Sequence, residues 1–318
     1  MKLLYKRKSR TFAARALVVF CVVLTWVVNA NVARADAPPK ATSTQTKASA
    51  AITAAEAKVS QGLVLLKRGS PDDLRQAYRL FEEAAKAKNP DAEFNLGTMY
   101  LNGQSVPVSN KDAFYWFGLA AEHGHVLAQY NFANMLESGT GGIKNESEAA
   151  RWFRKAAEGG FAVASNNLGV LYLEGRGVPK DEKLAADYFK KAAGQNYARA
   201  QHNLGRMYLN GRGVERDPKR ALSLLSAAAE QGDEESRYDV AYMYLEGNGV
   251  PINHKQALNL FETAARKGHA RSQYMTGYMY AKGLGTAQDM DKVFFWMKAA
   301  AAQGWPQAVK FLEQTAKK

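Results

Sequence analysis

The chain has 318 residues, 47% of them hydrophobic and 23% charged, which is an ordinary composition for a folded protein. Its net charge of +13 comes largely from the first 35 residues, which hold seven of the 43 basic residues and no acidic residue. The remaining chain has 36 basic and 30 acidic residues, a net charge of +6 and no cysteine, which excludes disulfide and thiolate chemistry and removes most support for nucleic acid binding.

The first 35 residues have the layout of a secretory signal peptide. Basic residues precede an apolar run over 16–28, and Ala33 and Ala35 supply the small residues of a cleavage site. We therefore predict cleavage after Ala35 and export to the periplasm. The alternative is an uncleaved inner-membrane anchor, although the apolar run is short for a span of about 20 residues. A lipoprotein is excluded because the bulky Phe20 precedes Cys21.

Two segments lead from the signal peptide to the regular part of the chain. Residues 36–50 are small and polar, and we predict a flexible linker there. Residues 51–90 are predicted to form a degenerate N-terminal repeat. Its second helix keeps the later register, since Phe81 stands 36 residues before Phe117, but its first helix lacks the glycine and tyrosine of later copies. Terminal repeats are expected to differ because one side faces solvent.

One sequence pattern then returns every 36 residues over 91–305, with no residue inserted or deleted between copies. It is clearest at Ala200–Gly213, and it defines six regular units. A fixed period of this size indicates a solenoid of stacked units rather than a globule with one closed core. The repeat therefore overrides the two domains of roughly 150 residues that length alone would suggest.

The first helix of each unit (helix A) is predicted over 90–102 in the first regular unit and at the same place in the others. Ala200, Leu204 and Met207 show the recurrent buried stripe at helical spacing. One further position holds only glycine or alanine, which allows a neighbouring helix to approach closely. A glycine, which takes a left-handed backbone without a Cβ penalty, ends each helix A. These glycines are Gly103, Gly139, Gly175, Gly211, Gly247 and Gly283.

The second helix of each unit (helix B) is predicted to begin after an N-cap residue and to end before a glycine or, once, Asn196. Residues 306–318 are predicted to form a C-terminal capping helix. The fold class is therefore all-α: a right-handed α-solenoid of antiparallel helix pairs with about 15 helices. The predicted N-caps are Ser109, Asn145, Asp181, Asp217, Asn253 and Asp289.

These recurrent positions resemble the Sel1-like repeat, a relative of the tetratricopeptide repeat with a longer loop between its helices. The matching motif is Ala, Leu-Gly, Met-Tyr, Gly-x-Gly-Val and an Ala-Ala…Gly ending, and residues 164–195 and 200–232 carry it in full. The resemblance covers roughly 54–318. It implies an interaction scaffold, such as eukaryotic adaptors in membrane-associated degradation or bacterial periplasmic or secreted proteins that assist envelope assembly, exopolysaccharide export or host-cell entry. The family's cysteine-rich subgroup is excluded because the chain after residue 35 has no cysteine.

Helix A also carries two sets of positions whose side chains change from unit to unit. In tetratricopeptide-like solenoids this face lines a concave groove, so the resemblance implies that a partner lies there. Tyrosine suits such a role because it offers a rigid ring with a polar tip. The alternative is that the rings pack between repeats. The first set is Phe94, Tyr130, Asn166, His202, Tyr238 and Tyr274. The second set is Thr98, Asn134, Val170, Arg206, Tyr242 and Tyr278. The residues predicted to bind a partner are Phe94, Tyr130, His202, Arg206, Tyr238, Tyr242, Tyr274 and Tyr278.

Other polar residues have structural explanations. A run of asparagines on helix A, from Asn95 to Asn203, is predicted to hydrogen-bond across the junctions between repeats. His123 and His125 have no third ligand at a recognisable spacing, so no metal site is predicted. Basic pairs at 154–155 and 190–191 are expected on a solvated outer face, with an anionic surface as the alternative partner. No phosphate loop or nucleophile–base set emerges, so no catalytic residue and no cofactor are predicted.

The predicted function is a non-enzymatic scaffold or adaptor of the bacterial periplasm or cell envelope that binds a peptide or protein partner in its groove. One alternative is a secreted factor that acts on host cells in entry or virulence. Another is a peptidoglycan- or glycan-binding envelope protein. An enzyme acting on peptidoglycan or a β-lactam would need a groove acid or nucleophile, and the repeat pattern leaves none unexplained. We expect no nucleic acid partner and no stable membrane span once the signal peptide is cleaved.

Overall fold

A computed structural model describes residues 43–316, which form 15 α-helices and no strand. The predicted signal peptide lies outside these residues. The helices are α1 (Ser43–Arg68), α2 (Pro71–Ala85), α3 (Pro90–Asn102), α4 (Asn110–Glu122), α5 (Val126–Ser138), α6 (Glu146–Glu158), α7 (Ala162–Glu174), α8 (Glu182–Ala193), α9 (Ala198–Asn210), α10 (Pro218–Glu230), α11 (Glu234–Glu246), α12 (His254–Arg266), α13 (Ala270–Lys282), α14 (Met290–Ala302) and α15 (Pro306–Thr315).

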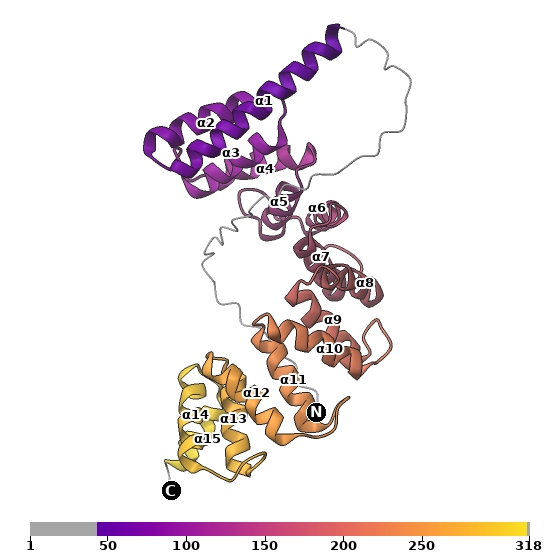
Figure 1. The fold of residues 1–318 in the computed structure, drawn as a ribbon, viewed down its shortest axis with the longest axis vertical. Coiled ribbons are helices and arrows are strands. Elements are labelled where there is room, and N and C mark those ends of the chain that lie inside the picture. Colours follow the sequence, from indigo (N-terminus) through magenta and orange to yellow (C-terminus); the bar gives the residue numbers. More distant parts are fainter. Residues whose placement is uncertain (1–42, 317–318) are drawn as a thin grey trace, which may run out of the picture.

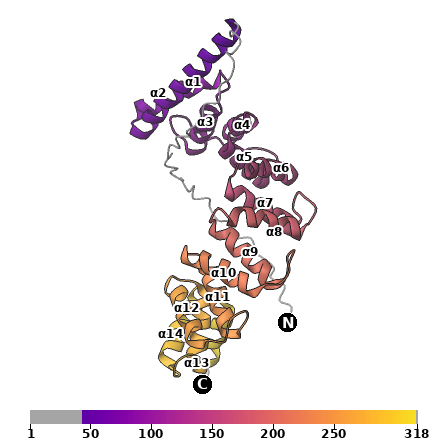
Figure 2. The same ribbon diagram turned by 45° about the vertical axis from the view of Figure 1, so that its right-hand side comes forward.

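The helices stack in chain order into an elongated, curved assembly (Figures 1 and 2). Among the described residues, the extensive helix–helix contacts all join helices that are consecutive in the chain. Helix A and helix B alternate from α1/α2 to α13/α14, and α15 closes the stack. The architecture is the solenoid that the 36-residue period predicts, because each unit packs only on its neighbours.

One buried side chain stands at the centre of each helix pair, at the same position of every helix B. The helix A residue opposite it must be small: a Cβ on Gly97 would lie 2.8 Å from the Phe117 ring, and one on Gly169 would lie 2.7 Å from the Phe189 ring. The neighbouring helix that the sequence predicts to approach this glycine closely is therefore helix B of the same unit. None of the central side chains is more than 3% exposed, and they are Phe81, Phe117, Phe153, Phe189, Leu225, Phe261 and Met297.

Local residues set the helix ends as the sequence predicts. The six helix A glycines all take a left-handed backbone, with φ between 66° and 77°. Each donates its N–H to the carbonyl four residues earlier. The six predicted N-cap side chains each accept a hydrogen bond from a backbone N–H of the first helical turn. Asn196, with a φ of 59°, replaces the left-handed glycine after helix B.

A second glycine in the loop after helix A fits each unit against the one before it. A Cβ on Gly177 would lie 2.2 Å from the carbonyl oxygen of Glu146, and one on Gly213 would lie 2.1 Å from that of Glu182. These carbonyls belong to the first residues of α6 and α8, the preceding helices B. Only glycine fits such a contact between two backbones. Ser105 is the exception, and the preceding unit there has a different loop.

The first unit departs from the regular pattern in its loop and in the length of its first helix. Helix α1 has 26 residues and begins at Ser43, so residues 43–50 of the predicted flexible linker are helical. Only Gly69 and Ser70 separate α1 from α2. The glycine missing from the register is displaced by one position, since a Cβ on Gly62 would lie 2.6 Å from the Phe81 ring. The sequence pattern predicted that the first helix lacks this glycine, but the glycine is present one position later, at Gly62.

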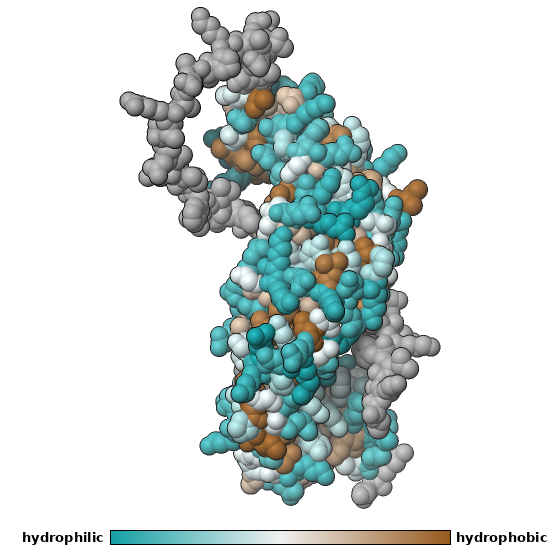
Figure 3. All heavy atoms as spheres, turned by 90° about the vertical axis from the view of Figure 1, so that its right-hand side faces the viewer, coloured by the Kyte–Doolittle hydropathy of each residue, from teal (hydrophilic) through white to brown (hydrophobic). Residues whose placement is uncertain are grey.

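The face of the molecule drawn in Figure 3 is mainly hydrophilic. Figure 3 shows the side on which α6 and α8 lie, with small, separate apolar areas on a hydrophilic background. At the C-terminal end, α15 buries Ala308 and packs Phe311 and Leu312 against the preceding unit. Within residues 43–316, no helix combines the length and the apolarity needed to cross a bilayer.

Candidate partner-binding surface

The first predicted set on helix A lies at the junctions between units. Its aromatic members pack against the residue that precedes the next helix A, so they fill the space between one unit and the next. Tyr238 is only 8% exposed as a result. These rings therefore stabilise the stack and offer a partner little surface. The ring pairs, with centroid distances, are Phe94–His125 (4.3 Å), Tyr130–Phe161 (5.0 Å), Tyr238–His269 (5.8 Å) and Tyr274–Trp305 (6.3 Å).

The second set is more accessible, and its exposure increases toward the C-terminal half. Thr98 and Asn134 hydrogen-bond to carbonyls four residues earlier in their own helices. The Arg206 side chain is 51% exposed, while Tyr242 and Tyr278 are 44% and 36% exposed. These three residues occupy α9, α11 and α13, which are successive helices A. A partner meeting this face would therefore encounter the second set of the C-terminal half.

A partly buried polar cluster joins α9 to α11. The His202 Nδ1 atom is 2.9 Å from Ser236 Oγ and 3.6 Å from the Asp233 carboxylate. The Asp239 carboxylate is 4.0 Å from His202 Nδ1 and 3.7 Å from Arg206 Nε. Its buried Oδ2 atom accepts no hydrogen bond from a described residue. Burial raises the pKa of Asp239, and the charges of Arg206 and His202 offset part of that effect.

Charged side chains continue from α11 to α13. The Glu235 carboxylate is 3.1 Å from His269 Nε2 and 3.3 Å from Arg271, and the hydrogen bond with His269 lowers the pKa of Glu235 to about 2. The Arg271 guanidinium lies 4.1 Å from the centre of the Tyr238 ring, an arrangement suited to a cation–π contact. Tyr242 stacks on Tyr238 with ring centroids 6.2 Å apart. Each exposed group here is thus held by a neighbour.

These residues together form one surface on which positive and negative groups surround the exposed Tyr242, whose ring stacks on the buried Tyr238 ring. Arg206 and Glu235 each leave about half of their side chain accessible, so the surface offers both donors and acceptors. Tyrosine and arginine are the residues most enriched among those that dominate binding energy at protein interfaces. Stacking and cation–π contacts restrain them before a partner arrives, which lowers the entropy lost on binding. We call it the mixed-charge surface, made up of Arg206, Glu235, Tyr238, Asp239, Tyr242 and Arg271.

A serine–histidine–glutamate line occurs at the same junction, but its serine is enclosed. His269 Nδ1 is 2.7 Å from Ser272 Oγ, and His269 Nε2 faces Glu235. Ser272 is fully buried, so a substrate carbonyl cannot reach its hydroxyl in this structure. Among residues 43–316, no group of three or more metal-ligating side chains comes together. The described residues thus assemble hydrogen-bonding and stacking groups rather than an open nucleophile.

Sequence reasoning missed a polar pair that connects the start of helix A to the end of helix B in the same unit. The sequence carried a signal for this pair, because in three units polar residues stand at two positions that are 30 residues apart. Burial raises the pKa of Glu93, which is 2% exposed, while its hydrogen bond with His123 acts in the opposite direction. This pair also explains His123 without a metal. The pairs are Glu93–His123, Gln201–Gln231 and Gln273–Gln303, each 2.8 Å apart.

The asparagine run has the predicted junction role at one place. Asn203 Nδ2 donates to Asn166 of the preceding unit at 2.9 Å, whereas Asn95 bonds a carbonyl of its own helix. At the next junction the same two positions hold Asp239 and His202. The polar cluster of the mixed-charge surface is therefore a charged version of an amide pair found one unit earlier.

Three of the four basic residues predicted on a solvated face of helix B are exposed, and members of this group also have partners in the protein. Arg154 donates to the Tyr172 hydroxyl at 2.6 Å, and Lys191 donates to a carbonyl of the preceding helix B at 2.5 Å. Lys190 pairs with Asp187 at 3.0 Å in its own helix. Arg154 and Lys191 therefore also connect successive units.

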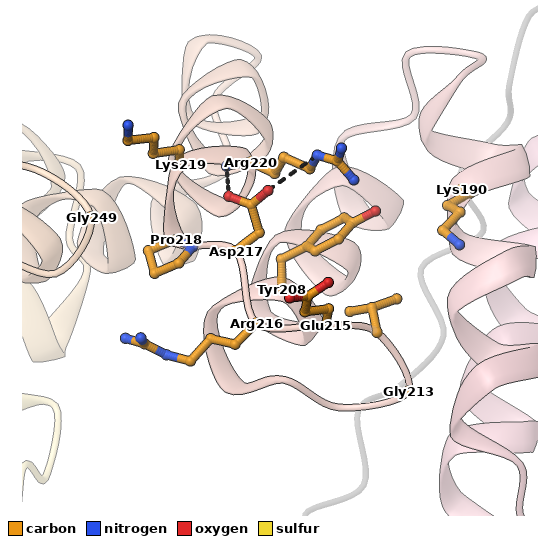
Figure 4. A pocket seen from close by; sticks show the side chains of 11 residues that line it. Lys190, Tyr208, Gly213, Glu215, Arg216, Asp217, Pro218, Lys219, Arg220 and Gly249 are labelled. Carbon is orange, nitrogen blue, oxygen red and sulfur yellow. Dashed lines mark hydrogen bonds and ion pairs between the residues drawn. The ribbon is translucent and has the colours of Figure 1, made fainter.

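A pocket of about 620 Å³ opens beside the loop between α9 and α10 (Figure 4). Its walls come from residues 213–220, from Tyr208, from Lys190 of α8 and from Gly249 of the next loop. None of these residues belongs to the mixed-charge surface, so the molecule has two separate candidate sites.

Comparison with protein families identifies one repeat throughout the described stack. The family profile described as "Sel1 repeat" matches seven consecutive segments, and the first falls on the altered α1/α2 unit. A search of curated proteins finds no match. The matched residues are 54–89, 90–125, 126–161, 162–197, 198–233, 234–269 and 270–305.

Two solved structures are similar to the chain in both sequence and fold. The first is c5321, a protective antigen present in uropathogenic Escherichia coli strains and displaying an SLR fold, with 31% identity and a TM-score of 0.75. That match covers 80% of this chain and 55% of the other, so this chain spans about half the length of that protein. The second is a Sel1 repeat protein from Oxalobacter formigenes, with 32% identity, a TM-score of 0.67 and coverage of 76% and 96%.

Proposed function

We propose a scaffold function in the bacterial cell envelope for this chain, which belongs to the Sel1 repeat family. Proteins of this family generally act as scaffolds for protein interactions. The observation that carries the proposal further is the mixed-charge surface, where Arg206 and Tyr242 are exposed on successive helices A. Tyr278 is exposed at the same position of the next helix A and continues the accessible face. The partner is a peptide or protein segment that lies across α9, α11 and α13.

The chemistry of the surface defines the kind of segment that fits it. Arg206 and Arg271 supply donors to backbone carbonyls or carboxylates, and Glu235 accepts from a backbone N–H or a basic side chain. Tyr242 offers a flat, accessible ring for an apolar or aromatic side chain. A peptide with both charges and at least one bulky apolar residue meets all of these groups. The periplasmic location rests on the predicted signal peptide.

Site-specific photo-crosslinking tests this proposal in cells. A photoreactive amino acid in place of Tyr242 is expected to give discrete adducts with a protein partner, because that position faces the segment. The same replacement of Tyr115, a 57% exposed tyrosine on helix B α4, is the matched control and is expected to give none of them. Adducts of the same mass from both positions, or none from Tyr242, would exclude the mixed-charge surface as the binding site.

Alanine variants separate binding from folding. Replacing Tyr242 and Tyr278 together is expected to reduce partner capture at least tenfold, which corresponds to about 1.4 kcal/mol. The helical circular dichroism signal is expected to stay unchanged, because both side chains are exposed. Loss of the helical signal would show instead that these rings are part of the core.

A secreted factor acting on host cells is the second candidate. It is favoured by the likeness to c5321, which is described as a protective antigen of uropathogenic strains. Cell fractionation distinguishes the two: a periplasmic scaffold is released by osmotic shock, whereas a secreted factor is found in the culture supernatant. The mixed-charge surface would serve either function, so localisation decides between them.

A further inference from the structure

The pocket between α8, α9 and α10 carries more positive than negative side chains. Asp217 is already engaged, because it accepts the Arg220 N–H at 3.0 Å and pairs with the Arg220 side chain at 3.2 Å. Lys219 makes no ion pair or hydrogen bond with its side chain among the described residues. The charged lining residues are Lys190, Glu215, Arg216, Asp217, Lys219 and Arg220.

The preceding unit shows how this space is closed elsewhere. Lys190 of α8 is followed after 18 positions by Tyr208 of α9, and Arg154 and Tyr172 stand at the equivalent places one unit earlier. Arg154 donates to the Tyr172 hydroxyl at 2.6 Å, which connects the two helices. Lys190 instead pairs with Asp187 at 3.0 Å and makes no bond to Tyr208. The pocket opens at the place where the earlier unit has this connection.

A later unit shows the same place occupied by an anion of the protein itself. The Tyr280 hydroxyl donates to the Glu262 carboxylate at 2.5 Å, and the Lys292 ammonium lies 4.6 Å from the centre of the Tyr280 ring. Tyr208 and Arg220 repeat this tyrosine–cation pair, with the guanidinium 5.7 Å from the ring centre. The α9/α10 unit thus has the hydroxyl and the cation, but Lys190 stands where the later unit has its glutamate.

Figure 4 shows the geometry of the pocket with Lys190 at the position where the later unit has Glu262. The Tyr208 hydroxyl points into the space between the Arg220 guanidinium and Lys190. The hydroxyl proton has no acceptor among the described residues, and Lys190 and Arg220 both line the pocket into which the hydroxyl points. An anion there would receive one hydrogen bond and two ion pairs.

We propose that this pocket binds an anionic group, a carboxylate or a phosphate, that belongs to a small polar ligand. The anion takes the place that the Glu262 carboxylate has in the later unit, where it accepts the Tyr208 O–H and pairs with Lys190 and Arg220. Lys190 gives up its ion pair with Asp187. The Asp187 side chain is 64% exposed, so this surface ion pair contributes little to stability. A volume of about 620 Å³ accommodates a sugar-sized body besides the anion.

Amide chemical-shift titrations of the chain with sodium phosphate and with sodium acetate test the proposal at constant ionic strength. Saturable shifts are expected for residues 208–220, and the anion that causes them identifies the source of the charge. Lys190→Glu is expected to weaken binding at least tenfold, because the new carboxylate occupies the anion's place as Glu262 does. Lys298→Glu is the matched control: it makes the same charge change at the same repeat position, in α14, and is expected to leave binding unchanged.

Three results would overturn the proposal. Shifts that fail to saturate or that spread over basic residues elsewhere would show only an adventitious ion. If Lys190→Glu binds the anion as tightly as the unchanged chain, Lys190 is not part of the site. If Lys298→Glu loses as much affinity as Lys190→Glu, the loss reflects the net charge of the chain and not a contact in the pocket. Lys190→Gln, which removes a charge without adding one, is expected to give an intermediate loss and serves if Lys190→Glu lowers the helical signal.

Discussion

Asp239 replaces in α11 the asparagine that the four preceding units carry at the same position. Its Oδ2 atom is buried without a hydrogen bond, and burial raises the pKa of the carboxyl above its usual value of 3.8. A residue with a raised folded pKa stabilises the fold below the unfolded pKa, and this stabilisation is lost as pH rises through the folded pKa. The ionised Asp239 therefore costs stability at neutral pH.

Asp239→Asn is expected to raise the free energy of unfolding by about 1 kcal/mol at pH 7, because the buried charge is removed. The gain is expected to shrink as pH falls toward 4, where the carboxyl of the unchanged protein becomes protonated. Thermal melts at pH 4 and pH 7 measure both effects. Asp72→Asn is the control with an 89% exposed carboxylate, and it is expected to change little. A loss of stability in Asp239→Asn at pH 7 would show that the ion pairs with Arg206 and His202 outweigh burial.

Asp239 is a buried carboxylate without a hydrogen bond to Oδ2 from a described residue, at a position where the preceding units carry asparagine. Its presence there points to a role other than stability. Asp239 holds Arg206 at 3.7 Å and approaches His202, so it sets the charge pattern of the mixed-charge surface. Proteins keep destabilising residues mainly where function requires them. The stabilised Asp239→Asn variant is therefore expected to capture the partner less well, which the crosslinking assay at Tyr242 measures.

Residues with local roles were predictable from the sequence, whereas residues with roles at the junctions were only partly so. An N-cap such as Asp217 acts on its own first turn, so its neighbours in the sequence determine its role. The His202–Asp239 and Gln201–Gln231 contacts depend on how one helix lies on another. The sequence predicted partner binding for both Tyr238 and Tyr242, and only the packing shows that one ring is buried and the other exposed.

At the scale of elements, the loop after helix A controls how successive units fit together. Gly177→Ala is expected to lower the free energy of unfolding by about 2–4 kcal/mol, because φ is 67° and the new Cβ would lie 2.2 Å from the Glu146 carbonyl. Gly160→Ala is the matched control: its φ is 88° but nothing lies within 4 Å of its Cβ. It is expected to cost only about 1 kcal/mol.

Urea unfolding of the two glycine variants measures the difference. A larger loss in Gly177→Ala would assign the excess to the contact between units rather than to the backbone conformation. Equal losses would show that the loop can move away from α6 without cost. The pattern of two glycines separated by one residue was visible in the sequence, but its physical reason, the carbonyl of the preceding helix B, required the stacked structure.

At the scale of the whole molecule, the sequence predicted the stack because the 36-residue period has no insertion and each unit packs on its neighbours. It could not predict which helix faces would remain accessible, since the same tyrosine type fills a junction at Tyr274 and is exposed at Tyr278. The pocket at Tyr208 was also beyond prediction. It depends on Lys190 bonding within its own helix, whereas Arg154 bonds to the next unit.

This modular architecture allows a whole unit to be removed as a test of the two proposed sites. Deleting residues 162–197 removes α7 and α8 and joins Phe161 to Ala198, which keeps the aromatic turn residue and the register. The variant is expected to unfold in one transition with the free energy of unfolding lower by about 2–5 kcal/mol, and its helical signal per residue is expected to be unchanged. It loses Lys190 and therefore phosphate or acetate binding, but it keeps α9, α11 and α13 and so keeps partner capture through Tyr242. Loss of both activities in a folded variant would show that the two sites depend on the full curvature of the stack, and loss of helical signal would show that the units are not interchangeable.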